Sequence, residues 1–171
     1  MQRVSVAGIS GSGKTTLAGA LAERLGVPHI ELDALHHGPN WQEATQAEFR
    51  ARVGDALAGQ EGWVADGNYM RKLGTWLVDQ TDTIVWLDLP LSVCVRRMWH
   101  RTTSRIHDGT ELWDTGNRET WPNFLLKWNA LLPYELRMHR RRRRELGQLR
   151  TRNVVRLRSE AEVEAWLAAQ G

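Results

Sequence analysis

The chain has 171 residues, of which 42% are hydrophobic, so it is long enough to form one domain around its own hydrophobic core. Its single cysteine, Cys94, excludes an internal disulfide framework and predicts a small buried side chain in a reducing compartment. No apolar run has the length of a membrane span and no leader-like segment precedes the first strand, so we expect a cytoplasmic protein. The net charge of +3 is modest, although six arginines within residues 137–144 concentrate positive charge locally.

The first predicted strand, with Val4 and Val6 at alternate positions, runs into the sequence Gly-Ile-Ser-Gly-Ser-Gly-Lys-Thr at residues 8–15. This segment matches the phosphate-binding pattern G-x-x-x-x-G-K-[ST] at every fixed position, and leucines follow it at helical spacing. Glycines let backbone N–H groups turn towards a phosphate chain, and the helix adds the positive end of its dipole. We therefore expect ATP here, with Lys14 at the β- and γ-phosphates and Thr15 as a ligand of Mg²⁺. The expected nucleotide-binding residues of this segment are Gly8, Ser10, Gly11, Ser12, Gly13, Lys14, Thr15 and Thr16.

Three more strands are predicted in the first half of the chain. A second short strand ends at Asp33, and the residues from Ala34 to Trp41 have a loop-like composition. Apolar residues between Phe49 and Leu57 then predict an amphipathic helix. Residues 63–65 predict a third strand ending at Asp66, and a short helix follows near residues 73–77. The nearly continuous apolar run at residues 83–87 is typical of a strand covered on both faces, as in parallel sheets.

A helix is predicted from about Leu91, and Arg97, Arg101 and Arg105 recur along it at intervals of four residues, which places them on one face. Residues 102–122 lose hydrophobic periodicity and predict a mobile excursion. Helix returns at residues 124–147 with a break at Pro133, a last strand covers residues 153–157, and Ser159 caps a final helix. Strands that alternate with helices in this way predict an α/β fold, with a parallel sheet covered on both faces.

Two further segments, together with the phosphate-binding pattern, resemble the adenylate-kinase-like branch of the P-loop kinases. Asp-Gly-Asn-Tyr-Met-Arg at residues 66–71 is similar to the acidic segment that closes that family's third strand, and Asp-Leu-Pro at residues 88–90 to its Asp-x-Pro turn. Within the branch, the stretches around Asp66 and Asp88 most resemble the group named DNA topology modulation proteins. The resemblance implies a P-loop NTPase three-layer sandwich with a five-stranded parallel sheet in the order 2-3-1-4-5. It also implies a single P-loop kinase-like domain over residues 1–171, with a lid at about residues 102–122.

The resemblance assigns roles to two aspartates at strand ends. Asp66 would lie next to the phosphate loop and bind Mg²⁺, usually through water; the alternative is a turn carboxylate that caps local backbone. Asp33 would hold or deprotonate the hydroxyl of a phosphoryl acceptor, against a structural role as a helix cap or turn. The expected acceptor-side residues are Asp33, Asp66, Tyr69 and Arg71.

Arginines are expected to neutralise the phosphates, because phosphoryl transfer spreads negative charge over the equatorial oxygens. The resemblance makes Arg97 and Arg101 nucleotide-binding residues, with Arg101 also catalytic. Arg118 is expected to be a lid arginine that arrives on closure, with Arg105 as a second candidate. The alternative for the helical arginines is a solvated helix face, which is the usual meaning of charged residues at this spacing.

The acceptor could be a small molecule or a nucleotide-like compound. The segment between the second and third strands is short for a nucleoside-monophosphate clamp, and its Arg50 and Arg52 belong to no recognisable monophosphate motif. Trp41 and Trp113 could form an apolar acceptor wall, whereas Trp63, Trp86, Trp99 and Trp166 are expected in the core. His36 and His37 are adjacent and lack further ligands, so we expect them to line the acceptor pocket rather than to bind a metal.

Two classes of function fit the sequence. The first is an ATP- and Mg²⁺-dependent kinase that transfers the γ-phosphoryl group to the acceptor. The second is a nucleic-acid-associated ATP-binding protein of the DNA topology modulation type, which the basic run at residues 137–144 would suit because it could contact phosphates without sequence specificity. No nucleic-acid-reading motif accompanies that run, so the sequence favours the kinase.

Overall fold

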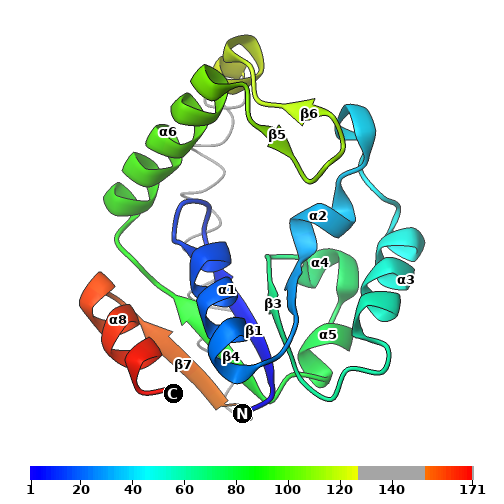
Figure 1. Ribbon diagram of the computed structural model, residues 1–171, viewed down its shortest axis with the longest axis vertical. Coiled ribbons are helices and arrows are strands. Elements are labelled where there is room, and N and C mark those ends of the chain that lie inside the picture. The colour runs from blue at the N-terminus through cyan, green and yellow to red at the C-terminus, as the bar shows by residue number, and fades with distance from the viewer. Residues whose placement is uncertain (127–152, 171) are drawn as a thin grey trace.

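The fold is built on one five-stranded parallel sheet, and the computed structural model describes residues 1–126 and 153–170. The strands are β1 (Arg3–Gly8), β2 (His29–Glu31), β3 (Trp63–Asp66), β4 (Thr83–Leu87) and β7 (Asn153–Leu157). Their spatial order is β2-β3-β1-β4-β7, and β7 is the fifth of these strands along the chain (Figure 1). The predicted order 2-3-1-4-5 and the α/β sandwich are therefore confirmed.

Helices cover both faces of the sheet because side chains alternate between the faces along each strand. On one face, α1 (Lys14–Leu25) and α8 (Glu160–Ala168) pack on Val4, Val6 and Val85. On the other face, α3 (Gln46–Leu57), α4 (Met70–Leu73) and α5 (Trp76–Asp79) lie over the β2–β3 side, where Trp63 and Ala65 join the core. The sheet is thus the middle of three layers, and β1 runs through its centre to the phosphate loop.

Local capping fixes where two of these helices begin. Thr45 Oγ1 accepts a hydrogen bond from the Glu48 backbone N–H at 3.3 Å, and Glu48 Oε2 accepts one from the Thr45 N–H at 2.9 Å, which forms a capping box at the start of α3. Ser159 Oγ accepts from the Glu162 N–H at 3.2 Å, so the predicted cap of the last helix is confirmed.

The helix that carries the arginines is longer than the sequence suggested. α6 spans Leu91–Asp108, so residues 102–108 are helical rather than part of an irregular excursion. Its buried face consists of Cys94, Met98 and Thr102. Because Thr102 is polar, the hydrophobic periodicity of the sequence stops there although the helix continues. Cys94 is fully buried, as predicted. α6 ends at Gly109, whose φ of 60° suits the left-handed end of a helix.

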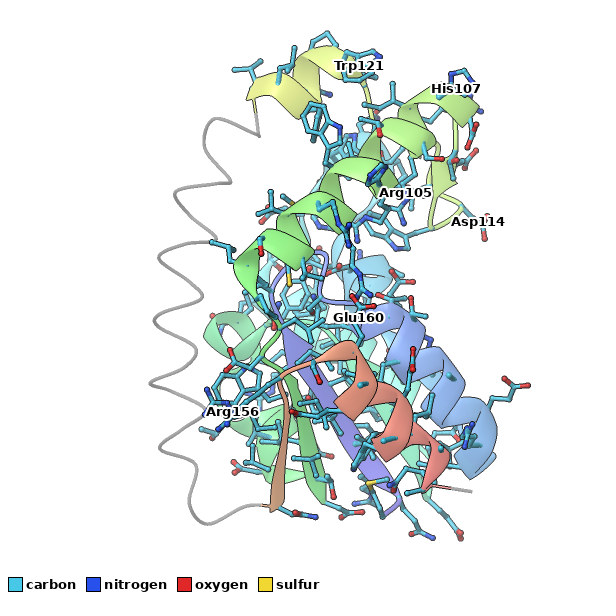
Figure 2. The ribbon with its side chains drawn as sticks, turned by 90° about the vertical axis from the view of Figure 1, so that its left-hand side faces the viewer. Arg105, His107, Asp114, Trp121, Arg156 and Glu160 are labelled. Carbon is cyan, nitrogen blue, oxygen red and sulfur yellow. The ribbon has the colours of Figure 1, made fainter. Side chains whose placement is uncertain are left out.

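Beyond α6, the chain turns back in a short antiparallel hairpin of β5 (Glu111–Leu112) and β6 (Asn117–Arg118), and residues 121–126 are again helical. The hairpin reaches α2 (Leu32–His36) and the single turn η1 (Pro39–Trp41), which occupy most of the segment predicted as a loop (Figure 1). The second strand was predicted to end at Asp33, but β2 ends at Glu31 and Asp33 lies in the first turn of α2. In Figure 2, α6 extends away from the sheet, with His107 near its far end. The helix predicted at residues 124–147 and the basic run at residues 137–144 fall mostly or wholly outside the described residues.

Tryptophan positions test the predicted core. Trp63 and Trp86 are buried as predicted, and Trp166 is half-buried. The prediction for Trp99 was wrong, because this residue is 40% exposed on α6, where its ring packs against Phe124 with centroids 5.2 Å apart. Across the described ranges, no helix combines the length and the apolar composition needed to cross a membrane.

Candidate active site

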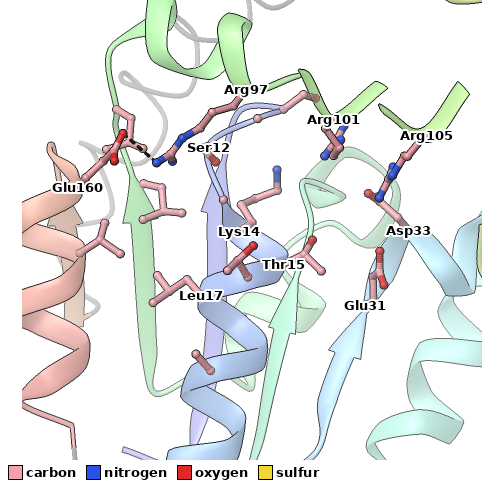
Figure 3. Close-up of a pocket in the computed structure, with 18 of the residues that line it drawn as sticks. Ser12, Lys14, Thr15, Leu17, Glu31, Asp33, Arg97, Arg101, Arg105 and Glu160 are labelled. Carbon is pink, nitrogen blue, oxygen red and sulfur yellow. Dashed lines mark ion pairs between the residues drawn. The ribbon is translucent and has the colours of Figure 1, made fainter. Parts of the chain in front are cut away.

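A cavity of about 680 Å³ lies at the carboxyl ends of β1 and β2, where ligands bind in open parallel sheets (Figure 3). Its lining comes from the phosphate loop, from α6, from the β2–α2 junction, from the hairpin segment and from α8. Among the residues predicted for the site, it is lined by Ser10, Gly11, Ser12, Gly13, Lys14, Thr15, Thr16, Asp33, Arg97 and Arg101. Most of the predicted site therefore surrounds one volume.

The phosphate loop fits tightly under α6. Gly11 and Gly13 have φ of 76° and 89°, which side chains rarely adopt. A Cβ atom at Gly11 would also collide with the backbone carbonyl oxygen of Cys94, whereas one at Gly13 would lie 3.7 Å from Arg97 Nη1. The loop can therefore lie against α6 only because it is glycine-rich, and this contact brings Arg97 beside it. Ser12 Oγ lies in the cavity lining and has no hydrogen-bond partner among the described residues.

Thr15 and Asp66 meet beside this loop, because β3 is the direct neighbour of β1 and pairs Val6 with Asp66. Thr15 Oγ1 donates a hydrogen bond to Asp66 Oδ2 at 2.7 Å. Asp66 is 2% exposed, and its other oxygen lies 2.9 Å from His29 Nε2. A hydroxyl and a carboxylate side by side are the oxygen donors that Mg²⁺ prefers when it keeps several of its waters, so these residues fit that ion.

Asp33 lines the cavity from α2, close after β2. Tyr69 donates its hydroxyl to Asp33 Oδ1 at 2.7 Å, and no other described residue forms a hydrogen bond with this carboxylate. Burial and then the negative charge of Asp33 raise the pKa of Tyr69 far above its ordinary value, so the phenol stays a donor. One carboxylate oxygen is thus held in place, and the other is open to a ligand.

The histidines beside Asp33 do not line the cavity, contrary to the prediction. His36 is buried and accepts a hydrogen bond from Lys72 Nζ at 2.8 Å, and burial followed by the charge of Lys72 lowers the pKa of His36. His37 instead stacks on Trp113, with ring centroids 5.2 Å apart. These rings support the acceptor end from outside it.

Arg97, Arg101 and Arg105 point from one side of α6 into the cavity above the phosphate loop (Figure 3). Arg97 Nη2 pairs with Glu160 Oε1 at 2.8 Å, whereas Arg105 lies towards Asp33. Loss of water around the guanidinium, and then repulsion from Arg105, lower the pKa of Arg101, although the residue is exposed. A guanidinium group nevertheless keeps its charge in proteins. Three cations along one side of the cavity favour a polyanionic ligand.

Four predicted residues do not line the cavity, and the side chain of a fifth, Arg71, falls outside the described residues. Arg118 is exposed on β6 and does not line the cavity; its Nη1 lies near Gly109 instead, 3.6 Å from the position that a Cβ atom there would take. Arg105, the second candidate for the lid arginine, does line the cavity. Tyr69 touches Asp33 rather than the cavity, and Asp66 reaches the site through Thr15. The fourth is Gly8, which is buried at the end of β1.

The sequence reasoning missed several residues of the site. Asn68 holds the start of the phosphate loop, because its amide bonds both the N–H and the carbonyl of Gly8. Glu31 lines the cavity and accepts a hydrogen bond from Trp113 Nε1 at 2.9 Å. Trp41 and Trp113, in contrast, were predicted as a possible acceptor wall, and both line the cavity. A contact between residues 31 and 113 has no signal in the sequence, since only the fold brings them together.

Comparisons with known proteins identify the family of the chain and proteins of similar fold. Residues 4–120 match the family model described as AAA domain. Cytidylate kinases of Halobacterium salinarum and Pyrococcus horikoshii are each 29% identical, and the chain spans only 57% and 56% of their lengths, with 57% of this chain covered in both cases. A gluconokinase from Sinorhizobium meliloti 1021 is 26% identical with a TM-score of 0.55, and the match covers 98% of this chain and 92% of that one. A shikimate kinase from Bacteroides thetaiotaomicron shares the fold, with a TM-score of 0.60 and 17% identity. That match covers 98% of this chain and 95% of the shikimate kinase. Because the matched family model spans well over half of the sequence, the chain belongs to the AAA domain family.

Proposed function

We propose that the protein is an ATP- and Mg²⁺-dependent kinase that transfers the γ-phosphoryl group of ATP to a hydroxyl group of a small acceptor. The observation that carries the proposal is the sharing of one cavity by the phosphate loop, three arginines and the open carboxylate oxygen of Asp33. A protein that only stored nucleotide would need the first of these groups but not the last. The proposal treats the chain as a single domain, with the β5–β6 hairpin as its lid.

On the donor side, the phosphate loop would bind the phosphates through backbone N–H groups, and Lys14 would reach the β- and γ-phosphates. Thr15 and Asp66 would hold Mg²⁺, which would supply positive charge to the transferred group. Arg97 would bind nucleotide beside the loop, while Arg101 and Arg105 would neutralise the charge that develops during transfer. Arg105 replaces Arg118 in this scheme because it lines the cavity.

On the acceptor side, Asp33 would accept the proton of the attacking hydroxyl group, with Tyr69 holding its orientation. Glu31 and Glu119 line the same cavity and would repel a second phosphate group. Carboxylates and the indole rings of Trp41 and Trp113 suit a polyhydroxylated acceptor, whose hydroxyl groups donate hydrogen bonds and whose C–H faces pack on aromatic rings.

The arginines of α3 lie outside the cavity, which argues against a nucleoside-monophosphate acceptor. Arg52 Nη1 donates to the Leu35 carbonyl at 3.1 Å, and Arg50 lies over the Trp76 ring at 5.1 Å from its centroid. The similarity to the gluconokinase supports a polyhydroxylated acceptor, and the names of the cytidylate kinases support phosphoryl transfer in general. No observation among the described residues supports the alternative of a nucleic-acid-associated protein. The basic run on which that alternative rests lies outside them.

ADP release in the presence of MgATP tests the proposal, with D-gluconate, shikimate and cytidylate as separate acceptor probes alongside a wider set of polyols. We expect ADP release that depends on a hydroxylated acceptor and that is strongest with one without a phosphate group. Release driven best by cytidylate would overturn the acceptor class. No acceptor-dependent release with any compound, together with salt-sensitive binding of a labelled DNA duplex, would favour the alternative function.

Asp66→Asn should raise the Mg²⁺ concentration needed for half-maximal activity by about tenfold, because a neutral amide is a poorer partner for the ion and its waters than a carboxylate. Titration of Mg²⁺ against activity, with calorimetry of Mg²⁺–nucleotide binding as a second readout, measures this. Asp55→Asn on the exposed side of α3 is the control and should leave the Mg²⁺ requirement unchanged. An unchanged requirement in the Asp66 variant would remove this residue from the metal site.

Tyr69→Phe should lower kcat by about tenfold while the KM for ATP stays nearly constant, since it removes only the hydrogen bond to Asp33. The remaining ring can keep its packing on Phe49 and His36, whose centroids lie 4.7 and 4.9 Å away. Steady-state kinetics at varied ATP separate the two parameters, and a melting curve checks the fold. Wild-type kcat in a folded variant would mean that Asp33 needs no such partner.

A further inference from the structure

One buried side chain of the hairpin bonds to the backbone of the segment that follows α2. Asn117 on β6 is 3% exposed. Its Nδ2 donates to the Gly38 carbonyl at 2.9 Å, and its Oδ1 accepts from the Trp41 backbone N–H at 2.9 Å. The amide therefore binds the backbone of a segment far away in the sequence, through both a donor and an acceptor.

These hydrogen bonds do not serve the hairpin itself, which has its own. Two hydrogen bonds close its turn. The Gly116 N–H donates to Glu111 Oε1 at 2.7 Å, and the Thr115 hydroxyl donates to the Leu112 carbonyl at 2.8 Å. The side chain of Asn117 is consequently left to hold the hairpin against residues 38–41.

Backbone strain is concentrated at this same contact. In the described ranges, the non-glycine residues with positive φ are Asn40 and Trp41 on one side and Trp113 and Asp114 on the other, with φ between 54° and 59°. Bulky side chains rarely adopt this conformation, and it persists only where surrounding contacts hold it. Three contacts hold it here. The Asn117 amide oxygen accepts a hydrogen bond from the Trp41 N–H, and Trp113 donates one to Glu31. The indole rings of Trp41 and Trp113 also pack edge-on, with centroids 6.0 Å apart.

We propose that Asn117 is a positioning residue that clasps the hairpin onto residues 38–41 and thereby holds Trp41 and Trp113 as the wall of the acceptor end of the cavity. The inference rests on the proposed function of this cavity as a kinase site. With the clasp intact, the two indole rings narrow the access of bulk water to the acceptor end. Without it, water can replace the acceptor hydroxyl, attack the γ-phosphorus of ATP and break its bond to ADP, which releases ADP, inorganic phosphate and a proton.

Hydrogen exchange of the ligand-free protein tests the clasp without any catalytic activity. The variants are Asn117→Ala, which removes both hydrogen bonds, and Asn117→Asp, whose carboxylate can still accept from Trp41 but opposes the Gly38 carbonyl. Asn123→Ala, at an exposed position beyond the hairpin, is the matched control. We expect exchange at residues 37–42 and 110–118 to quicken at least tenfold in both clasp variants, with β1, β3 and β4 unchanged as the sign of an intact fold. Wild-type exchange at the hairpin in both variants would overturn the proposal.

The rate of inorganic phosphate release from MgATP without acceptor tests the consequence for water. We expect it to rise severalfold in Asn117→Ala and Asn117→Asp and to stay at the wild-type value in Asn123→Ala. A merely structural residue would lower this rate through loss of folded protein, so an unchanged or lower rate in folded clasp variants contradicts a water-excluding role. If the wild type neither hydrolyses nor transfers phosphate, the proposed function fails, and hydrogen exchange still decides whether Asn117 is a clasp.

Discussion

Lys14→Ala is expected to lower kcat/KM for phosphoryl transfer by about a thousandfold and to leave the melting temperature nearly unchanged. Lys14 would contact the transferred phosphate, whereas the loop around it is shaped by other groups. The glycine at position 11 lets the loop pack on α6, and Asn68 holds Gly8 through both of its backbone groups. The lysine itself donates a hydrogen bond to the Ile9 carbonyl at 3.1 Å, within the loop.

Two further variants make this test specific. Lys14→Arg should also lose most activity, because a planar guanidinium does not replace a compact ammonium group in a tight phosphate cradle. Lys72→Ala is the matched control, since that lysine bonds His36 and Glu43 outside the cavity and should leave most of the transfer rate intact. Steady-state kinetics of the three proteins, with melting curves, give the comparison. Substantial ATP-dependent transfer by Lys14→Ala would remove this residue from the proposed mechanism.

Asp33→Asn is expected to lower kcat by about a hundredfold or more, because an amide cannot accept the proton of the acceptor hydroxyl. The KM for ATP should change little, since Asp33 lies at the opposite end of the cavity from the Arg97–Glu160 pair (Figure 3). The fold should tolerate the change, as Tyr69 can still donate to the amide oxygen at position 33.

Comparison with Asp66→Asn separates the two proposed carboxylate roles. The loss of activity in Asp33→Asn should depend on neither the Mg²⁺ nor the ATP concentration. The loss of activity in Asp66→Asn should instead be relieved by added Mg²⁺. Activity measured over a grid of Mg²⁺ and ATP concentrations distinguishes the two patterns. If both variants differ from the wild type only in melting temperature, both carboxylates are structural and the proposed site is misplaced.

The parts of the fold that could be predicted from the sequence are those with a continuous local sequence pattern. The glycine loop, its strand and its helix occupy residues 3–25 without a break, so local spacing was enough to find them. The order of the strands came from a resemblance, and the position of Asp66 beside the loop followed from that order. Thr102 shows the limit of this reasoning, because a buried polar residue ended the apparent period while the helix continued.

The acceptor side could not be predicted because it is assembled from segments that are distant in the chain. Arg105 could be placed by helical spacing, whereas the register of Arg118 depended on a hairpin that the sequence did not indicate. The clasp of Asn117 on Trp41 and the hydrogen bond from Trp113 to Glu31 join residues whose separation in sequence is 76 and 82 positions. Such contacts carry no periodicity, and only the folded chain reveals them.

Transfer of a labelled phosphoryl group tests the central claim most directly. The protein is incubated with Mg²⁺, ATP labelled in its γ-phosphoryl group and the best acceptor from the ADP-release screen, and the products are separated by mass spectrometry. The account predicts that the label appears on a hydroxyl group of the acceptor in the wild type, and that this product is lost in Lys14→Ala and Asp33→Asn. Label found only in inorganic phosphate, or remaining in ATP that the protein demonstrably binds, would contradict a kinase built on this cavity.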